Sequence, residues 1–483
     1  MNLATINIAA ILPPLVLSLF GIAVMVLEPF VNEQRKSSLG WLAFAGTLAA
    51  IVSLIPMAGN RGQWYSNLWI VDDYDVFLDF IFLLIAAITI LTSIDFLRRE
   101  EEMNHPEFYS LLLFATAGML MMAASNELVM VFLGLEILSI ATYVMAGFRR
   151  TDLKSNESAL KYFLLGSFSS AFFVYGVALI FGATGSTNLL VIADALRSSE
   201  IQISLVSLSA ALMLIALCFK VAVAPFHVWT PDVYEGAPTP VTGFMSVGPK
   251  AAGFAVLFRV FLTAFPSIED RWGSAIWMVA ALTMVLGNVI ALVQPNIKRM
   301  LAYSSIAHAG YVAVAFAATS NQGVSAALFY LLAYSLTNLG AFAMVTIVSR
   351  KDDKLVDVTD YAGLGSKRPG LAAVLSLFLL SLAGVPGTAG FAGKFFIFRA
   401  AVESRLVWLA IIGVVTTVVS FYYYLYVIVQ MYMREPHDEF SDVRLHGSLK
   451  FALMISAAGT LYLGLLPTRV LDWTATAALS ALR

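Results

Sequence analysis

The sequence ALMLIALCFKVAVAPFHVWT, residues 211–230, places Lys220 and Pro225 inside a long run of apolar residues. A helix needs about 20 mainly apolar residues to cross the hydrocarbon core of a membrane. A lysine at mid-membrane costs roughly 2.5–3.5 kcal/mol on the translocon-insertion scale, and a proline interrupts the helix that carries it. The stretch therefore predicts a broken transmembrane helix with an ionisable side chain inside it.

The composition extends this interpretation to the whole chain. Of the 483 residues, 60% are hydrophobic and 12% are charged, whereas about a quarter of the residues in soluble domains are charged. The net charge of −2 gives no sign of nucleic-acid binding, and the single cysteine, Cys218, permits no intramolecular disulfide. We therefore predict an all-α polytopic membrane protein that forms one transmembrane domain over residues 1–483.

Runs of apolar residues of the required length recur along the sequence. They predict about fourteen transmembrane helices, at 8–28, 39–58, 76–97, 108–124, 127–147, 159–182, 203–230, 240–262, 273–293, 301–319, 324–349, 370–398, 406–431 and 449–467.

Lysine and arginine fix the expected orientation of these helices, because short cytoplasmic loops carry the excess of positive charge. Most of the 29 Lys and Arg lie in loops on one side, such as Arg149 and Arg150 after the fifth helix. With an even number of helices, both termini are then expected on the non-cytoplasmic side of the membrane.

Four cations and one acid remain inside the predicted helices: Lys220, Lys250, Arg259, Lys394 and Glu136. Arg259 lies near the outer end of its helix, so we expect it to snorkel to the interface. For the other four residues, one interpretation is a buried ion pair that only fixes helix packing. The other is a pathway for protons or ions, in which Glu136 balances the charge of a lysine.

Two of the lysines belong to helices that proline or glycine interrupts. Pro225 follows Lys220, and GVPGTAGFAG, residues 384–393, precedes Lys394. Broken helices at membrane depth are tolerated mainly beside a cavity or within protein. The breaks correspond if residues 108–262 and 273–431 are two five-helix repeats, and the odd helix number makes the second repeat inverted.

Histidine and cysteine usage argues against a redox cofactor in this chain. Of the five histidines, His105, His227, His308, His437 and His446, only His308 lies well inside a predicted helix. It is either a proton relay group or a hydrogen-bonded packing residue. One cysteine cannot hold an iron–sulfur cluster, and the glycine-rich stretches lack the strand–turn–helix setting of a nucleotide site. We expect no cofactor and no metal in this chain.

Three motifs together resemble a known family. FKVAVAPFHVWTPDVYEGAPTPVT (219–242), NIKRMLAYSSIAHAGY (296–311) and SLAGVPGTAGFAGKF (381–395) are similar to the antiporter-like membrane subunits of respiratory complex I. The TPDVYEGAP motif and Lys394 resemble the subunit type that carries a lysine in its twelfth helix, where another type has a glutamate. A third type has a long C-terminal lateral helix, for which this chain has no room after residue 467.

The resemblance implies that Glu136, Lys220, Lys250 and Lys394 form a hydrated axis for proton translocation. His308 is a further relay candidate because of its own position inside a helix. It implies a subunit of a proton-translocating NADH:quinone oxidoreductase in a bacterial inner membrane. FMN, iron–sulfur clusters, NADH and quinone, such as ubiquinone, are expected in partner subunits. The partners would be other membrane-arm subunits and, indirectly, the peripheral redox arm.

Other functions remain open on the sequence alone. An Mrp-type cation/proton antiporter subunit and a membrane subunit of a hydrogenase-type complex would share the fold and the buried lysines. A purely structural scaffold is the third alternative. The sequence also leaves open whether protons or sodium ions move.

Overall fold

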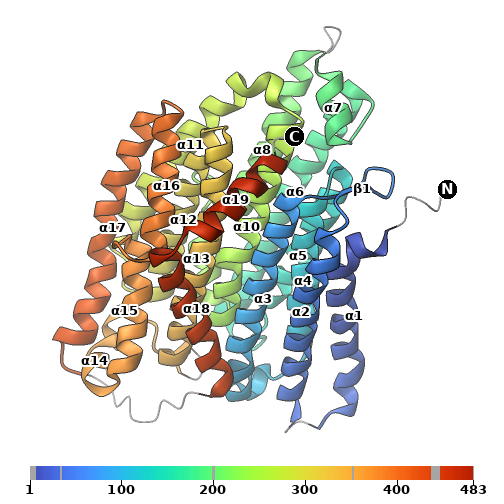
Figure 1. The fold of residues 1–483 in the computed structure, drawn as a ribbon. Coiled ribbons are helices and arrows are strands. Elements are labelled where there is room, and N and C mark those ends of the chain that lie inside the picture. Colours follow the sequence, from blue (N-terminus) through green and yellow to red (C-terminus); the bar gives the residue numbers. More distant parts are fainter. Residues whose placement is uncertain (1–6, 33–34, 198–201, 351–352, 437–445, 482–483) are drawn as a thin grey trace.

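The computed structural model describes residues 7–32, 35–197, 202–350, 353–436 and 446–481, and these are almost entirely helical (Figure 1). The membrane fold predicted from the sequence is confirmed. The α-helices are α1 (Leu12–Leu27), α2 (Ser37–Ala58), α3 (Asp73–Arg99), α4 (Glu107–Ala124), α5 (Leu128–Ala146), α6 (Leu153–Thr184), α7 (Leu189–Ala195), α8 (Ile203–Val221), α9 (Thr230–Gly236), α10 (Thr239–Thr263), α11 (Glu269–Ala291), α12 (Ile297–Ala317), α13 (Asn321–Val348), α14 (Leu364–Lys367), α15 (Pro369–Ala383), α16 (Ala389–Glu403), α17 (Val407–Met433), α18 (Gly447–Leu465) and α19 (Thr468–Ala481).

Short elements complete the described chain. Strands β1 (Gly62–Trp64) and β2 (Trp69–Val71) form an antiparallel hairpin in which Gln63 pairs with Ile70. The 3-10 helices are η2 (Ile8–Ile11), η3 (Glu28–Phe30), η5 (Glu101–Met103), η6 (Pro266–Ile268) and η8 (Val358–Tyr361).

The number of membrane crossings agrees with the prediction from apolar runs. In the described residues, 13 helical segments are long and apolar enough to span a membrane. The remaining predicted helix, 370–398, corresponds to the shorter pair α15 and α16, which together make one interrupted crossing. The segment predicted at 203–230 consists of α8, the non-helical residues 222–229 and the first residue of α9.

Polar side chains at the helix N-termini explain where several crossings begin. Asp72 caps α3 by accepting a hydrogen bond from the backbone of Asp75, and Glu127 caps α5. Asn296 does the same for α12, and Ser320 for α13. These side chains satisfy backbone N–H groups that have no partner within the helix, which matters most where water is scarce.

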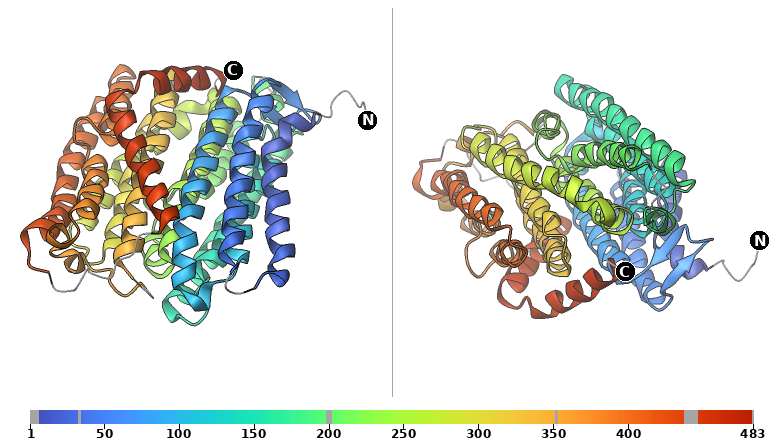
Figure 2. Two further views of the ribbon diagram at one scale, coloured as in Figure 1. Left: turned by 60° about the horizontal axis from the view of Figure 1, so that its bottom comes forward. Right: turned by 90° about the horizontal axis from the view of Figure 1, so that it is seen from above.

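Four helices form the interior of the molecule: α3, α10, α12 and α13. Every residue of the membrane-length window of α13 is buried, against 33% in the peripheral helices α1, α6 and α17. Seen from above (Figure 2, right), the N-terminal helices and α17 lie at opposite ends of the molecule, with the interior helices between them. The ionisable residues that need shelter from lipid are therefore expected on these inner helices.

Helix α19 was not among the helices predicted from apolar runs. It lies obliquely across α3 and α13 (Figure 1). Trp473 of α19 makes an edge-to-face contact with Phe77 of α3, with 4.7 Å between ring centroids. Tyr65, in the hairpin that precedes α3, donates a hydrogen bond to the carbonyl of Asn7 at 2.8 Å. The first and last described segments thus lie at the same end of the bundle, opposite α14 (Figure 1).

The two interrupted crossings end their first halves in the same way. The C-cap residue after α8 is Ala222, with φ of 58°, and the C-cap residue after α15 is Gly384, with φ of 94°. The N–H of Val223 bonds to the carbonyl of Cys218 at 3.1 Å, and that of Val385 bonds to Leu380 at 3.0 Å. Both are left-handed C-caps closed by the same backbone hydrogen-bond pattern.

A second matching feature joins the entry of α5 to the segment after α6. The N–H of Leu128 bonds to the carbonyl of Thr187 at 2.9 Å, and that of Leu189 bonds to Asn126 at 3.0 Å. The segment after α13 repeats this pairing at the entry of α12. There, Ile297 bonds to Val356 at 2.7 Å and Val358 bonds to Pro295 at 2.8 Å.

Candidate functional site

Lys220 lies in the last turn of α8, directly before the first break, and is 5% exposed. Its Nζ donates a hydrogen bond to Ser139 Oγ of α5 at 2.8 Å. Glu136 lies one turn earlier on α5, and its charge reaches Lys220. It is partly buried and accepts a hydrogen bond from Ser170 of α6. The structure therefore brings Lys220 and Glu136 to one helix pair, with Ser139 as the direct contact of the lysine.

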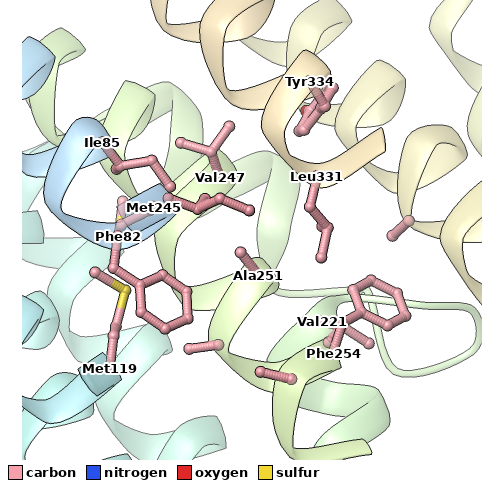
Figure 3. Close-up of a cluster of buried hydrophobic side chains, with 14 of the residues drawn as sticks. Phe82, Ile85, Met119, Val221, Met245, Val247, Ala251, Phe254, Leu331 and Tyr334 are labelled. Carbon is pink, nitrogen blue, oxygen red and sulfur yellow. The ribbon is translucent and has the colours of Figure 1, made fainter. Parts of the chain in front are cut away.

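Gly253 of α10 allows Lys220 to approach the next helix. A Cβ atom at Gly253 would lie 2.6 Å from Val221 Cγ1 and 3.5 Å from Lys220 Cγ. Val221 and Phe254 of α10 both belong to the apolar cluster of Figure 3. The stem of Lys220 thus contacts α10 one helical turn from Lys250.

Lys250 is 3% exposed and follows Pro249 within α10. Its Nζ donates to the carbonyl of Ser305 at 2.9 Å and to the Ser305 hydroxyl at 2.6 Å, both on α12. The ammonium also lies 5.9 Å from the ring centroid of Tyr234 in α9. Among the described residues, no carboxylate forms a salt bridge with Lys250, so neutral oxygen atoms and one aromatic ring hold its charge.

Lys394 lies in α16, after the second break, and is 3% exposed. Its Nζ donates to the carbonyls of Leu382 at 2.8 Å and Ala383 at 3.2 Å. These are carbonyls of the last turn of α15, which lack helical partners because the helix ends there. The ammonium also lies 4.9 Å from the ring centroid of Tyr311. Lys394 therefore caps the negative end of a half-helix.

Helix α12 carries the polar groups that lie between Lys250 and Lys394. His308 is 3% exposed, and its two ring nitrogens meet the hydroxyls of Tyr330 and Tyr424, the latter at 3.1 Å. Tyr424 also shares a hydrogen bond of 2.5 Å with Ser304. Tyr311, one turn beyond His308, packs edge-on against the imidazole at 5.6 Å. His308 is thus both hydrogen-bonded and placed between two lysines, which leaves its relay role a prediction.

Some polar atoms near the polar groups of α12 have no hydrogen-bond partner in the protein. Asn338 of α13 donates to Ser246 Oγ at 2.6 Å, while its Oδ1 has no hydrogen-bond partner. The hydroxyl of Tyr334, which stacks on His308 at 4.8 Å, also has none. Buried polar groups of this kind are usually satisfied by water. The Asn338 carbonyl oxygen and the Tyr334 hydroxyl therefore offer binding positions for water in an otherwise apolar interior.

A charged cavity opens at the end of the bundle where α12 begins. Its volume is about 430 Å³, and its walls include Arg149, Lys154, Glu235, Lys298 and Asp353. Lys298 is 2% exposed and donates to the carbonyl of Ala237 at 2.7 Å. The apolar runs at 273–293 and 301–319 predict that Lys298 lies in the loop between two helices. The structure instead makes it a buried lysine at the cavity wall.

Asp353 is the acid that balances these cations. It lies 3.5 Å from Lys298 Nζ and 4.0 Å from Arg149. Burial by itself would raise the pKa of Asp353, but Lys298, Arg149 and hydrogen bonds from Thr239 and Ser349 hold that pKa below its ordinary value. The cavity wall therefore keeps a carboxylate ionised although it is largely buried.

Two expectations about charges in the membrane are wrong. Arg259 does not snorkel to the interface: it is 3% exposed and pairs with Asp72 at 2.5 and 3.0 Å. Glu136 is not the only acid deep in a helix, because Asp75 and Asp79 of α3 are 0% exposed. The predicted helix begins at residue 76 and so excludes Asp75, whereas α3 begins at Asp73. Asp79 lies within the predicted helix, three residues from its start.

One group of described side chains could hold a metal ion: Glu28, His105 and Glu107. Their ligand atoms lie within 4.8 Å of one another at the ends of α1 and α4, but Lys36 already pairs with Glu28 at 3.7 Å. These three residues are separate from the set formed by Lys220, Lys250, His308 and Lys394. His227 lies half-buried between α8 and α9, and His437 lies outside the described residues. The absence of a metal or cofactor stays a prediction.

Interrupted crossings and buried ionisable side chains place this protein in the class of membrane-embedded transporters. Residues 125–420 match the family model described as NADH:quinone oxidoreductase/Mrp antiporter, transmembrane. The chain is 47% identical over 470 residues to NADH-quinone oxidoreductase subunit N of Trichlorobacter lovleyi, with 97% of this chain and 96% of the relative covered. It is 46% identical over 463 residues to NADH-quinone oxidoreductase subunit N 1 of Solibacter usitatus. The chain therefore belongs to this family, and within it to the subunit N group.

Solved structures agree with this assignment. A chain of respiratory complex I from Thermus thermophilus is 34% identical, with a TM-score of 0.79 over 95% of this chain and 98% of that one. A chain of the Mrp complex from Dietzia sp. has a TM-score of 0.86 over 99% of this chain and 98% of that one. At 20% identity, the second similarity shows the fold alone.

Proposed function

We propose that this chain is the proton-translocating membrane subunit of an NADH-quinone oxidoreductase. Partner subunits would bind NADH, FMN, iron–sulfur clusters and quinone, and would carry out electron transfer. One observation carries the proposal: Lys220, Lys250, His308 and Lys394 are each at most 5% exposed and come from four different helices. Such costly groups are retained inside a membrane protein mainly for a transport function.

The charged cavity is the proposed entry. Lys298 in the cavity wall donates a hydrogen bond to the carbonyl of Ala237 at 2.7 Å. Ala237 directly follows α9, and α9 carries Tyr234, whose ring centroid lies 5.9 Å from the Lys250 ammonium. In the proposed mechanism, Lys220 takes up a proton from this side, and Lys250 relays it laterally. The hydroxyls of α12 and His308 carry it toward Lys394, which releases it to the opposite side.

Glu136 would control the uptake step. Its negative charge favours the ammonium form of Lys220, although Ser139 is the direct contact at 2.8 Å. Moving Glu136 away would remove this attraction and drive the proton onward. Because Glu136 is partly exposed at the surface of α5, an adjacent subunit could move it. This provides a link between the proposed pump and chemistry in partner chains.

The two five-helix repeats, 108–262 and 273–431, remain part of the proposal. They are supported by the matching left-handed caps at Ala222 and Gly384. They are also supported by the repeated backbone pairing at the entries of α5 and α12. Inverted repeats of this kind permit alternating access around a central site.

The proposed orientation places both termini on the non-cytoplasmic side, and cysteine labelling tests it. The native Cys218 is buried, so it should not react. Gln63→Cys in the β1–β2 hairpin should react with an impermeant thiol reagent added outside cells, and Lys367→Cys in α14 should not. Both positions are exposed. The reverse labelling pattern would overturn the orientation.

The proposed function is tested with Lys220→Ala and Lys394→Ala in the intact complex, reconstituted into vesicles. We expect each variant to lose most NADH-driven proton uptake, because a relay group contributes about 100-fold or more to a proton-transfer step. Lys450→Ala, at an exposed position, is the control. Unchanged pumping in assembled Lys220→Ala and Lys394→Ala complexes would favour a scaffold. Cation transport by the isolated chain without NADH would favour the Mrp-type alternative.

A further inference from the structure

Near its N-terminal end, helix α3 carries two buried carboxyl groups that the proposed proton path through Lys220, Lys250 and Lys394 does not use. Asp75 and Asp79 are both 0% exposed, and none of their four side-chain oxygens has a hydrogen-bond partner. They lie one helical turn apart on the same face of α3. Phe82, three residues beyond Asp79, packs in the apolar cluster with Met119 and Val247 (Figure 3). The pair thus adjoins the packed interior, away from lipid.

The nearest buried cation does not neutralise this pair. Arg259 of α10 forms its ion pair with Asp72, at 2.5 and 3.0 Å, and lies 4.8 Å from the ring centroid of Tyr74. The Arg259 Nε has no hydrogen-bond partner. Asp72 and Arg259 act on Asp75 with opposite signs, and the charge of Asp75 in turn acts on Asp79. Two buried carboxylates one helical turn apart, with no hydrogen-bond partner for any of their oxygens, cannot both stay ionised, so we infer that the pair holds a proton.

The carboxyl groups of α3 and the cations of α10 can be ordered by their depth along the two helices. Asp72 and Arg259 mark one level, because they are paired, and α3 and α10 run in opposite directions beside each other. At 1.5 Å per residue, Lys250 lies about 13 Å below Arg259, and Asp79 lies about 10 Å below Asp72. Asp79 therefore reaches almost to the level of Lys250, and Asp75 lies between Asp79 and the outer end of the bundle.

We propose that Asp79 and Asp75 form a proton-carrying carboxyl pair that gives Lys250 an outlet along α3, separate from Lys394. This inference rests on the proposed function. The Lys250 ammonium gives a proton, through water, to the Asp79 carboxylate, leaving a neutral amine and a carboxylic acid. Asp79 passes the proton to Asp75, and Asp75 releases it beside Asp72 at the outer end. Only a proton moves, so no oxidant or reductant is required.

The test uses Asp75→Asn, Asp79→Asn and the double variant in the intact complex in vesicles. Two quantities are measured: protons translocated per electron pair, and the infrared carbonyl band of protonated carboxylic acids. We expect a lower proton ratio in each variant, since each lost relay group slows its transfer step on the order of 100-fold. The protonated carboxyl band should be present in the unaltered complex and absent in the double variant.

Matched variants separate a relay role from a structural one. Thr89→Val alters a residue of α3 that is 2% exposed and whose hydroxyl bonds only to the carbonyl of Ile85, so it should keep the full ratio. Asp79→Glu keeps the acid and should restore pumping that Asp79→Asn loses. If the Asn variants assemble and keep the full ratio, the outlet is overturned.

Three further outcomes also decide the question. If proton translocation of the unaltered complex requires Na⁺, and the Asn variants lose that requirement, the pair is a cation site and the proposal fails. If Lys220→Ala abolishes pumping while the double Asn variant does not, only the outlet fails and the proposed function stands. If neither affects pumping, the proposed function fails with it.

Discussion

The buried lysines are held by different kinds of partner. Lys394 donates to two backbone carbonyls at a helix end, whereas Lys220 donates to one hydroxyl and feels Glu136 at longer range. Carbonyls at a half-helix C-terminus form a fixed negative field. A hydroxyl accepts from an ammonium and donates to a neutral amine equally well. Lys220 is therefore the lysine whose charge depends most on a movable group.

Asp353 gives a prediction of pH dependence at the residue scale. Its pKa is lowered by Lys298, Arg149 and hydrogen bonds that together outweigh burial. A lowered carboxyl pKa stabilises the folded state above the unfolded value, about 3.9, and this contribution is lost as pH falls through the folded value. Asp353→Asn should therefore destabilise the protein at neutral pH by about 3–5 kcal/mol, since it leaves Lys298 buried and unpaired.

Thermal unfolding of the purified complex checks this prediction. The difference between Asp353→Asn and the unaltered protein should be large at pH 7 and shrink under acid conditions. Asp194→Asn, which removes an exposed partner of Arg197, should change the unfolding temperature little at any pH. A constant difference for Asp353→Asn across pH would contradict the assignment of an ionised carboxylate.

At the scale of elements, the second break depends on Gly384. Its φ of 94° lies in a region that residues with a Cβ adopt only with strain, and a Cβ there would lie 3.3 Å from Lys394 Cδ. Gly384→Val should therefore both strain the end of α15 and displace Lys394 from its two carbonyls. We expect proton translocation to fall as far as in Lys394→Ala, while the complex still assembles.

Gly370→Ala is the matched control, because it lies in the same helix with nothing within 4 Å of the added Cβ. Proton uptake by vesicles that contain each variant is the measurement. Full pumping by Gly384→Val would mean that the position of Lys394 at the break is not needed.

The membrane crossings could be predicted from the sequence, because a helix must be apolar over about 20 residues to cross the hydrocarbon core. The buried lysines could be predicted as candidate functional residues, because charged side chains are rare within such helices. Helix α19 could not, because it is 14 residues long and covers α3 and α13 without crossing the membrane. The burial of Lys298 could not be predicted, because the residues that cover it, Ala237 after α9 and Asp353, are distant in the sequence. The partner of Arg259 lies 187 residues away, at a separation that local patterns do not reveal.

At the scale of the whole molecule, the polar row and the apolar surface have separate roles. Exposed apolar side chains such as Leu133, Ile140 and Phe168 cover α5 and α6, where lipid or neighbouring membrane subunits of the complex pack. Lys250 and His308 lie on the interior helices α10 and α12, whereas Lys220 on α8 and Lys394 on α16 have buried side chains on helices nearer the periphery. Glu136 on α5 is only partly buried and lies nearest to that surface. Coupling to partner subunits is therefore expected to enter through α5.

The central claim is that the buried lysines carry the translocated protons. It is tested most directly by the number of protons moved per electron pair in the Lys220→Ala and Lys394→Ala complexes, at matched rates of quinone reduction. We predict that this ratio falls in both variants and stays unchanged in Lys450→Ala. An unchanged ratio in an assembled, electron-transferring Lys220→Ala or Lys394→Ala complex would contradict it.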